Sequence, residues 1–309
     1  MQIFRILYVI LAIGSCGCLA QQSTITRPSS AAVSWSEFVW VPLDLGKTHI
    51  DKGAMLLPVK VPDEKAIFYM QLDLGSNVSM FYNLPYSELL AKHQALSRTT
   101  FTGQIANTVL HGVPFSNREG GTSLKEQGDI PVIGTIGLDF LEKRVLVIDY
   151  AKQRIAILDS EADLTPYFDR KLAFVDAVCR NDKFFVPLRI ADKIYENQFF
   201  FDTGSSIFPL STTSELWQSL TERTGDESSN VVLEVPAWGS QIKLIGAPLK
   251  GSFEIASASI SNPLIFFQPD NEDDFSKWPF PVSGLFGNAL FFDRMIVVDV
   301  PHHRFGISR

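Results

Sequence analysis

The chain carries the same series of short segments twice, which constrains its fold more than any other feature of the sequence. Residues 69–76 (YMQLDLGS) and 198–205 (QFFFDTGS) each follow an apolar run with D-x-G-S, at a separation of 129 residues. Three further pairs keep the same order: residues 57–61 with 186–190, 110–115 with 244–249, and 134–149 with 284–299. Because the order is kept while the separation grows to 150 residues, we infer a duplication and expect two lobes of like fold.

The secondary structure that the sequence predicts is mostly β. Short runs rich in Phe, Ile, Val and Tyr alternate with Gly, Pro, Asn and Asp, whereas helical periodicity is confined to residues 87–96 and 214–221. We expect an all-β fold with a few short helices, in which two homologous β-barrel-like lobes, residues 32–162 and 163–309, enclose a cleft. Residues 32–50 form an extra strand of the first lobe or part of a sheet that bridges both lobes.

The first twenty residues are typical of an export signal, with one basic residue before an apolar run and small residues after it. Cleavage follows Ala20, or precedes Cys16, where I-G-S-C resembles a bacterial lipobox. In the second case the signal is residues 1–15 and Cys16 becomes a lipid anchor. Residues 21–31 are a polar spacer. We expect an exported protein that is secreted, periplasmic or a lipoprotein of the cell envelope.

Composition excludes several classes of function. A net charge of −7 without a basic cluster argues against nucleic acid as a partner, and no internal apolar run reaches the ~20 residues of a membrane-spanning helix. The five His lack the spacing of a zinc site, and no phosphate-binding or dinucleotide-binding glycine motif is present. We therefore expect a monomer that uses no metal and no cofactor.

The duplicated aspartates indicate the chemistry. If related lobes pack about a pseudo-two-fold axis, equivalent residues face each other, so Asp73 faces Asp202. Two carboxyl groups at about 3 Å share one proton, so one is a base while the other is an acid. With a water between them, the pair can hydrolyse a peptide bond without a metal. Asp149 and Asp299, which also recur, are expected only to end strands before hairpin turns.

Residues 201–206 (FDTGSS) resemble the active-site signature of pepsin-like aspartic proteases, and residues 134–141 (GTIGLDFL) are similar to the closing motif of retropepsin-like domains. The resemblance covers both lobes and implies that Asp73 and Asp202 are the catalytic pair. It also assigns supporting roles to the residues of the two turns. Ser76 and Ser205 would bond the outer carboxylate oxygens, and Thr203 would tie the lobes together through its hydroxyl. The supporting residues are Gly75, Ser76, Thr203, Gly204 and Ser205.

The sequence departs from the family pattern at two places. Leu74 stands where the family has Thr or Ser, which removes the first-lobe half of the interlobe hydroxyl network. The hairpin expected to close the cleft as a flap, within residues 100–113, lacks the family's Tyr. Its residues near the tip are Gln104, Ile105, Ala106 and Asn107. A second-lobe counterpart carries Trp238 and Gly239, so the sequence also allows a retropepsin-like arrangement in which each lobe contributes one flap.

These observations lead to one main expectation and two alternatives. The main one is an aspartic endopeptidase that cleaves extended peptide or protein substrates through a water activated by Asp73 and Asp202. The alternative, favoured by Leu74 and the missing flap Tyr, is a catalytically inactive pepsin-like module that binds peptides or envelope proteins. A peptidase with a very narrow processing specificity is a third possibility.

Overall fold

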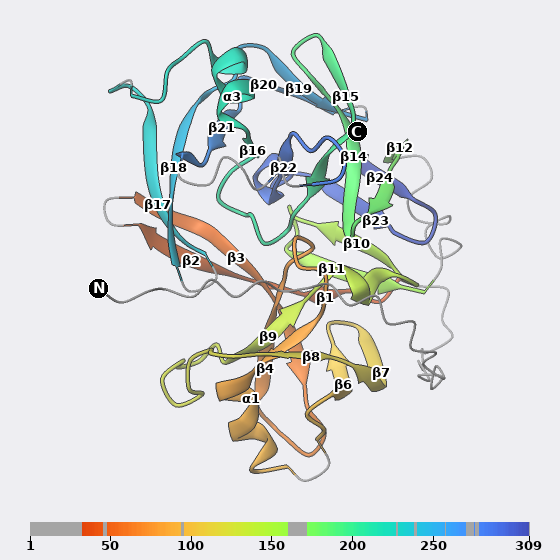
Figure 1. Cartoon of the computed structure of the whole chain (residues 1–309). Helices are drawn as coiled ribbons and strands as arrows, with labels where there is room; N and C mark the ends of the chain where they lie inside the picture. Colours follow the sequence, from red (N-terminus) through yellow and green to blue (C-terminus); the bar gives the residue numbers. More distant parts are fainter. Residues whose placement is uncertain are drawn as a thin grey trace.

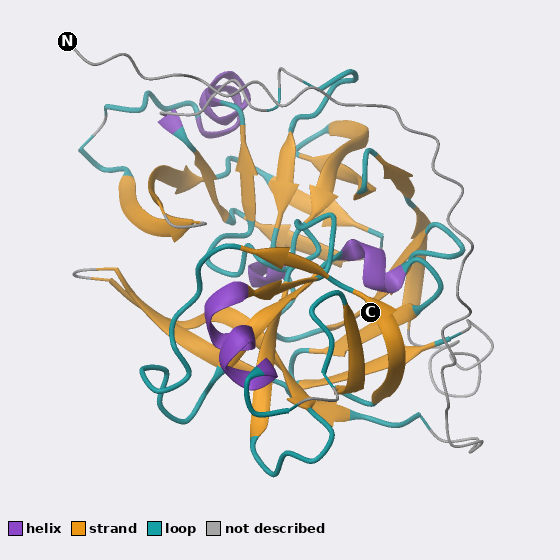
Figure 2. Ribbon diagram, turned by 60° about the horizontal axis from the view of Figure 1, so that its bottom comes forward, coloured by secondary structure: helices purple, strands orange, loops and turns teal. Residues whose placement is uncertain are grey.

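The computed structural model describes residues 33–45, 48–93, 96–159, 172–226, 228–237, 240–256, 258–269, 275 and 278–308. The predicted export signal, both cleavage sites and the spacer lie outside these residues. Strands make up most of the described chain, and the helices are short (Figure 2). Within the described ranges, no helix has the length and apolar character needed to cross a membrane.

The first lobe is built on a sheet with the strand order β7-β6-β3-β4-β9-β5-β8, in which β2 pairs with β3 beside this path (Figure 1). Its strands are β2 (Val39–Leu45), β3 (Thr48–Lys60), β4 (Ile67–Leu72), β5 (Met80–Tyr82), β6 (Thr100–Ile105), β7 (Thr108–Pro114), β8 (Ser116–Arg118) and β9 (Val132–Ile136). Helix α1 (Asn83–Leu90) follows β5. It begins earlier than the predicted residues 87–96, because Pro85 suits a first helical turn, where its missing N–H is not needed, and it ends earlier, at Leu90.

The second lobe is built on a sheet with the order β17-β18-β21-β16-β22-β15-β14-β19-β20, in which β13 pairs with β14. Its strands are β13 (Val178–Arg180), β14 (Lys183–Ile190), β15 (Lys193–Phe201), β16 (Leu210–Thr212), β17 (Val231–Ala237), β18 (Ser240–Pro248), β19 (Ser252–Ile255), β20 (Ala258–Ser261), β21 (Leu264–Phe267) and β22 (Gly284–Phe286). Helix α3 (Ser214–Thr221) coincides with the predicted one, and the Thr213 hydroxyl caps its N-terminus by accepting from Leu216 N.

The two sheets have the same topology. Read from β8 to β7, the first-lobe order corresponds strand by strand to the second-lobe order from β21 to β20, and each pair of neighbours has the same parallel or antiparallel direction. The register agrees as well, since Met70 pairs with Gly134 as Phe199 pairs with Gly284. The predicted fold class, two homologous curled sheets that form a bilobal β protein, is confirmed.

One of the four repeated blocks does not correspond in the structure. Residues 110–115 run through β7, which pairs with β6, whereas residues 244–249 run through β18, which lies between β17 and β21. The strand equivalent to β7 is β20. The likeness of these two blocks is therefore coincidental, because apolar residues followed by Gly and Pro suit the end of many strands. Among the described strands, the β17–β18 hairpin has no first-lobe counterpart.

A third sheet joins the lobes, with the order β1-β11-β10-β23-β24-β12. Its strands are β1 (Ser36–Glu37), β10 (Val145–Asp149), β11 (Arg154–Leu158), β12 (Leu172–Asp176), β23 (Met295–Asp299) and β24 (Arg304–Ser308). Strands β10 and β23 are antiparallel, and Val147 lies opposite Val297, its equivalent in the duplication. An isologous pair of this kind marks the pseudo-two-fold axis. Residues 32–50, predicted as one extra strand in either place, contribute a strand to each, β1 to this sheet and β2 to the first lobe.

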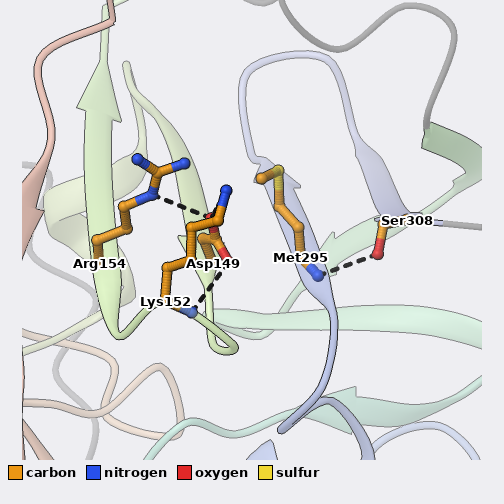
Figure 3. A network of polar contacts seen from close by, with 5 residues as sticks. All are labelled: Asp149, Lys152, Arg154, Met295 and Ser308. Carbon is orange, nitrogen blue, oxygen red and sulfur yellow. Dashed lines mark hydrogen bonds and ion pairs between the residues drawn. The ribbon is translucent and has the colours of Figure 1, made fainter.

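The recurring strand-end aspartates stabilise hairpin turns. Asp149 accepts hydrogen bonds from Lys152 N at 3.2 Å and Arg154 Nε at 3.0 Å (Figure 3). Asp299 accepts hydrogen bonds from the equivalent residues, from His302 N at 3.2 Å and from Arg304 Nη2 at 3.0 Å. Beside the first turn, Met295 N donates to Ser308 Oγ at 3.0 Å, which holds the start of β23 to the end of β24 (Figure 3). The expectation that Asp149 and Asp299 end strands is confirmed.

The strands that precede the D-x-G-S segments are anchored in the core. Leu72 and Phe201, the last residues of β4 and β15, are buried. The Phe201 ring lies 5.1 to 5.8 Å from the rings of Phe286, Phe305 and Phe291. Fully burying one such side chain stabilises the fold by about 1.5–3 kcal/mol, so each turn starts from a rigid strand end.

Candidate active site

Asp73 and Asp202 occupy equivalent positions at the ends of β4 and β15. Asp73 N donates to Ile136 O, and Asp202 N donates to Phe286 O, both at 3.0 Å. In each lobe the acceptor is the last residue of a parallel neighbouring strand, β9 or β22. The duplicated backbone therefore presents both carboxyl groups in the same way.

The two carboxyl groups meet where the lobes face each other. Gly75 N donates to Asp202 Oδ1 at 3.1 Å. A Cβ built on Gly75 would lie 2.4 Å from Asp202 Oδ1, and one on Gly204 would lie 2.5 Å from Asp73 Oδ1. Each aspartate thus packs against the glycine that follows the other, and glycine is required at both positions because any side chain would displace the opposite carboxyl group.

The two aspartates have different surroundings. Asp202 accepts from Gly75 N, from Gly204 N at 2.8 Å and from Ser205 Oγ at 2.7 Å, a set of donors that suits an ionised carboxylate. Asp73 accepts from Ser76 N at 3.1 Å. Burial raises the pKa of Asp73 well above 3.8, and the charge of Asp202 and a hydrogen bond with it raise it further. The pair can therefore hold one shared proton, with Asp73 as the protonated member.

Thr203 joins the lobes from one side only. Its buried Oγ1 accepts from Leu74 N at 2.9 Å and donates to Leu72 O at 3.0 Å. Leu74, at the equivalent position of the first lobe, is fully buried and offers no hydroxyl for the reciprocal pair of bonds. Half of the interlobe network is present, as the sequence predicts.

A second-lobe network around Asn288 supports the same turn, and the sequence analysis did not identify it. Asn288 Nδ2 donates to Thr203 O and Ser206 Oγ, both at 2.7 Å. Its Oδ1 accepts from Tyr150 OH at 2.5 Å, a bond between the two halves of the chain. The comparison of the two repeats could have indicated this residue, because the equivalent first-lobe position holds the apolar Leu138. An amide in place of a buried apolar side chain requires hydrogen-bond partners.

The hydroxyl of Ser76 differs from expectation, and Lys183 is a neighbour of the site that the sequence analysis did not identify. The Ser205 hydroxyl donates to Asp202, but the Ser76 hydroxyl donates to Val78 O at 2.9 Å, and only the backbone N–H of Ser76 reaches Asp73.

Lys183 contacts the turn that follows Asp73, because its Nζ donates to Gly75 O and Asn77 Oδ1. Burial lowers the pKa of Lys183, whereas the charges of Asp202 and Asp73 raise it. The ammonium in turn opposes the rise in the pKa of Asp73. No local sequence pattern indicates this contact.

The aspartates lie in a cavity of about 510 Å³ that both lobes line, within the size range of ligand sites. Its first-lobe wall is polar or charged, and its second-lobe wall is apolar. Besides the two aspartates, the first-lobe side chains are Gln71, Tyr82, Arg118 and Glu119. The second-lobe ones are Ile207, Phe208, Val235 and Ile242, with Ser205 beside Asp202 as the one polar exception among them. Tyr82 OH lies 2.6 Å from Thr135 Oγ1, and the pKa of Tyr82 is raised by burial and by the charge of Asp73. In the described ranges, no three His, Cys, Asp or Glu side chains gather in a way that could hold a metal ion.

The first-lobe hairpin expected to be the flap lies elsewhere. None of Gln104, Ile105, Ala106 and Asn107 is among the residues that line the cavity. The Asn107 amide donates to Ile157 O at 3.0 Å and accepts from Ile157 N at 2.8 Å, which fixes the tip of the hairpin to β11. Trp238 and Gly239 lie outside the described residues, but Val235 and Ile242, which flank them on β17 and β18, line the cavity.

Comparison with known proteins gives structural likeness without sequence likeness. No protein-family model and no curated protein matches the chain. Among solved structures, it is similar to basic 7S globulin from soybean, with a TM-score of 0.44 and 11% identity over 90% of this chain and 97% of that one. It is also similar to conglutin gamma, a basic 7S globulin from lupine seeds (TM-score 0.42, 10% identity, 90% and 95% covered). A third is edgp (TM-score 0.45, 10% identity, 91% and 96% covered). The chemistry of the site follows from the contacts of this chain rather than from these proteins.

Proposed function

We propose that the protein is an aspartic-type endopeptidase with Asp73 and Asp202 as its catalytic pair. The observation that carries the proposal is the reciprocal contact between each carboxyl group and the glycine of the other lobe, within a cavity that both lobes line. A buried carboxyl group with a raised pKa beside a carboxylate with three donors is a matched acid and base.

In the proposed reaction, the Asp202 carboxylate takes a proton from water while the water oxygen forms a bond to the peptide carbonyl carbon. The protonated Asp73 gives its proton to the carbonyl oxygen, so the intermediate is a neutral geminal diol. When the C–N bond breaks, the proton held by Asp202 moves to the leaving nitrogen, and a diol hydroxyl returns a proton to Asp73. The pair is then restored to a single shared proton, and one water has been consumed.

The proposed substrate is a polypeptide in an extended conformation. Both lobes line the cavity. A polypeptide can therefore lie across the aspartates, with its flanking side chains against the polar first-lobe wall and the apolar second-lobe wall. Together with the export signal in the sequence, this leads us to place the proposed activity outside the cytoplasm.

A second function, a peptide-binding module without catalysis, is favoured by two specific contacts. The ammonium of Lys183 lies beside the turn that follows Asp73, and its charge lowers the pKa of the Asp73 carboxyl group. Leu74 leaves the interlobe hydroxyl network one-sided. The first feature acts against the shared-proton state that the reaction requires, and the second leaves the backbone of the first-lobe turn held by a hydroxyl from one lobe only.

The two functions are separated by assaying the purified exported protein on a denatured protein between about pH 3 and 7, where a shared-proton pair works. Cleavage that is blocked by a statine-type peptide and lost in Asp202→Asn supports the peptidase. The matched control is Asp63→Asn, an exposed turn residue with φ of 62°, a conformation that asparagine tolerates. Saturable binding of the statine-type peptide without any cleavage contradicts the peptidase and supports the module.

A further inference from the structure

The β17–β18 hairpin is the one feature of the described second-lobe sheet that the duplication does not explain, and it contributes to the cavity. Val235 of β17 and Ile242 of β18 lie opposite each other in the ladder, and both line the cavity. A cross-strand pair presents its two side chains on the same face of a hairpin. This face of the hairpin therefore forms part of the wall of the cavity that holds the aspartates, with Val235 packed into the apolar cluster beneath it and Ile242 more exposed.

The hairpin is anchored at its base and reaches toward the other lobe. Leu233 and Leu244 pack with Phe208 and Phe266 in an apolar cluster, and β18 pairs with β21. Leu45, from β2 of the first lobe, packs against the same cluster. In Figure 1, β17 and β18 run from the second lobe down to β2 and β3. Apolar contacts therefore hold the hairpin on both sides of the cleft.

The first-lobe hairpin cannot occupy this position without losing its own contacts. Its tip is held to β11 by the two bonds of Asn107, and Ile105 and Ala106 are buried. The described part of the first lobe supplies a different wall, the segment from Arg118 to Gly121 beyond β8, which is held to α1 by the bond from Leu84 N to Gly120 O at 3.0 Å.

We propose that the cavity is covered from the second lobe, with a bound polypeptide lying between the β17–β18 hairpin and the aspartates. Val235 and Ile242 are then specificity-determining residues for one apolar side chain of that polypeptide. The proposal rests on the proposed function in taking a peptide as the ligand. Because the opposite wall carries Tyr82, Arg118 and Glu119, the apolar requirement applies to one side of the bound chain and not to both.

The test is to profile cleavage of a mixture of peptides by Val235→Ala, Ile242→Ala and a matched control, Val232→Ala. Val232 lies on the same strand as Val235 but is 53% exposed, and it does not line the cavity. A few methylene groups of apolar contact correspond to about 10-fold or more in kcat/KM. We expect Ile242→Ala to lower kcat/KM about 10-fold for peptides with a large apolar side chain at one subsite, and Val232→Ala to change it less than about twofold.

Two further variants keep the test decisive. Ile242 is only half-buried, so Ile242→Phe is expected to fold and to shift the preference at that subsite toward smaller side chains. Gln104→Ala, at the tip of the first-lobe hairpin, is expected to leave the preference unchanged. Thermal melting of each variant shows whether it is folded. An unchanged preference in both Ile242 variants, or an equal shift in Gln104→Ala, overturns the proposal.

If the unaltered protein cleaves nothing, the same comparison is made by calorimetric binding of a statine-type peptide with apolar side chains. A loss of affinity in Ile242→Ala that is absent in Val232→Ala supports the second-lobe cover even though the peptidase proposal has failed. Equal affinity in the two variants overturns the cover as well.

Discussion

The D-L-G-S turn of the first lobe and the D-T-G-S turn of the second have the same backbone and different side-chain networks. Both aspartates follow a buried strand end and donate a 3.0 Å hydrogen bond to a parallel neighbour. Only the second turn has a threonine that bonds across the lobes and a serine hydroxyl on its carboxylate. Duplication therefore explains where the two carboxyl groups lie, and later divergence of their neighbours explains why they have different hydrogen-bond partners.

The reciprocal glycine contact is the symmetric part of this comparison, and breaking it should have the largest effect. In Gly75→Ala or Gly204→Ala the new Cβ would lie 2.4 or 2.5 Å from the opposite carboxylate. We expect kcat/KM to fall by about 10² or more in both, because displacement of a catalytic group by about 1 Å costs that much. The unfolding free energy should fall by about 1–3 kcal/mol.

Steady-state kinetics and urea denaturation measure these two quantities. Gly225→Ala is the matched control, since its Cβ would meet no polar group, only the edge of the Phe267 ring at 3.0 Å and Ile245 Cδ1 at 3.8 Å. If only one of the two active-site variants is impaired, the contact is not reciprocal and the symmetric description of the site is wrong.

The one-sided hydroxyl network predicts that a hydroxyl is needed at position 203, whereas the side chain at position 74 contributes only apolar packing. Thr203→Val removes the partner of Leu74 N and Leu72 O, and a buried polar group left unsatisfied costs about 1–3 kcal/mol. We expect a loss of about 2–4 kcal/mol in unfolding free energy, measured by urea denaturation. Leu74→Ala should also destabilise, through an apolar cavity, but Thr203→Ser should restore most of the stability lost in Thr203→Val. No recovery in Thr203→Ser would show that the methyl group, not the hydroxyl, is what matters.

The raised pKa of Asp73 predicts a pH dependence of stability. A carboxyl group whose pKa is higher in the folded state stabilises the fold fully below its unfolded value, about 3.8, and this stabilisation is lost as pH rises through the folded pKa. We expect the unfolding free energy of Asp73→Asn to fall less than that of the unaltered protein as pH rises above about 4. Urea denaturation over a pH series measures this difference, and parallel curves would contradict it.

Substitution of Lys183 is expected to have the smallest effect of these variants, a shift in the pH dependence of the reaction rate. The lysine ammonium lowers the pKa of Asp73, so Lys183→Met should raise that pKa and move the alkaline limb of the pH–rate profile to higher pH. The control is Lys193→Met, an exposed lysine on β15 that does not line the cavity. An alkaline limb that stays in place, or moves to lower pH, would show that Lys183 acts only on the backbone of the first-lobe turn.

Local patterns in the sequence predicted the strands, because alternation of apolar residues and strand-end Gly-Ser turns depend on neighbours in the chain. The order and spacing of the repeated segments predicted the duplication and the pairing of Asp73 with Asp202. The same patterns failed for residues 110–115, since a run of apolar residues with Gly and Pro does not specify which strand it pairs with. They also placed the flap on the first-lobe hairpin, whose tip is held by a residue 50 positions away in the sequence.

What the sequence determined by itself is that two like halves bring matching aspartates to one axis, because that conclusion requires only order, spacing and the symmetry of like surfaces. Only the tertiary structure decided which groups surround each carboxyl group. Lys183, Asn288, Val235 and Ile242 reach the site through contacts between residues far apart in the chain. Burial, the partner of each hydrogen bond and the composition of the cavity walls are properties of packing, and packing sets the pKa of Asp73.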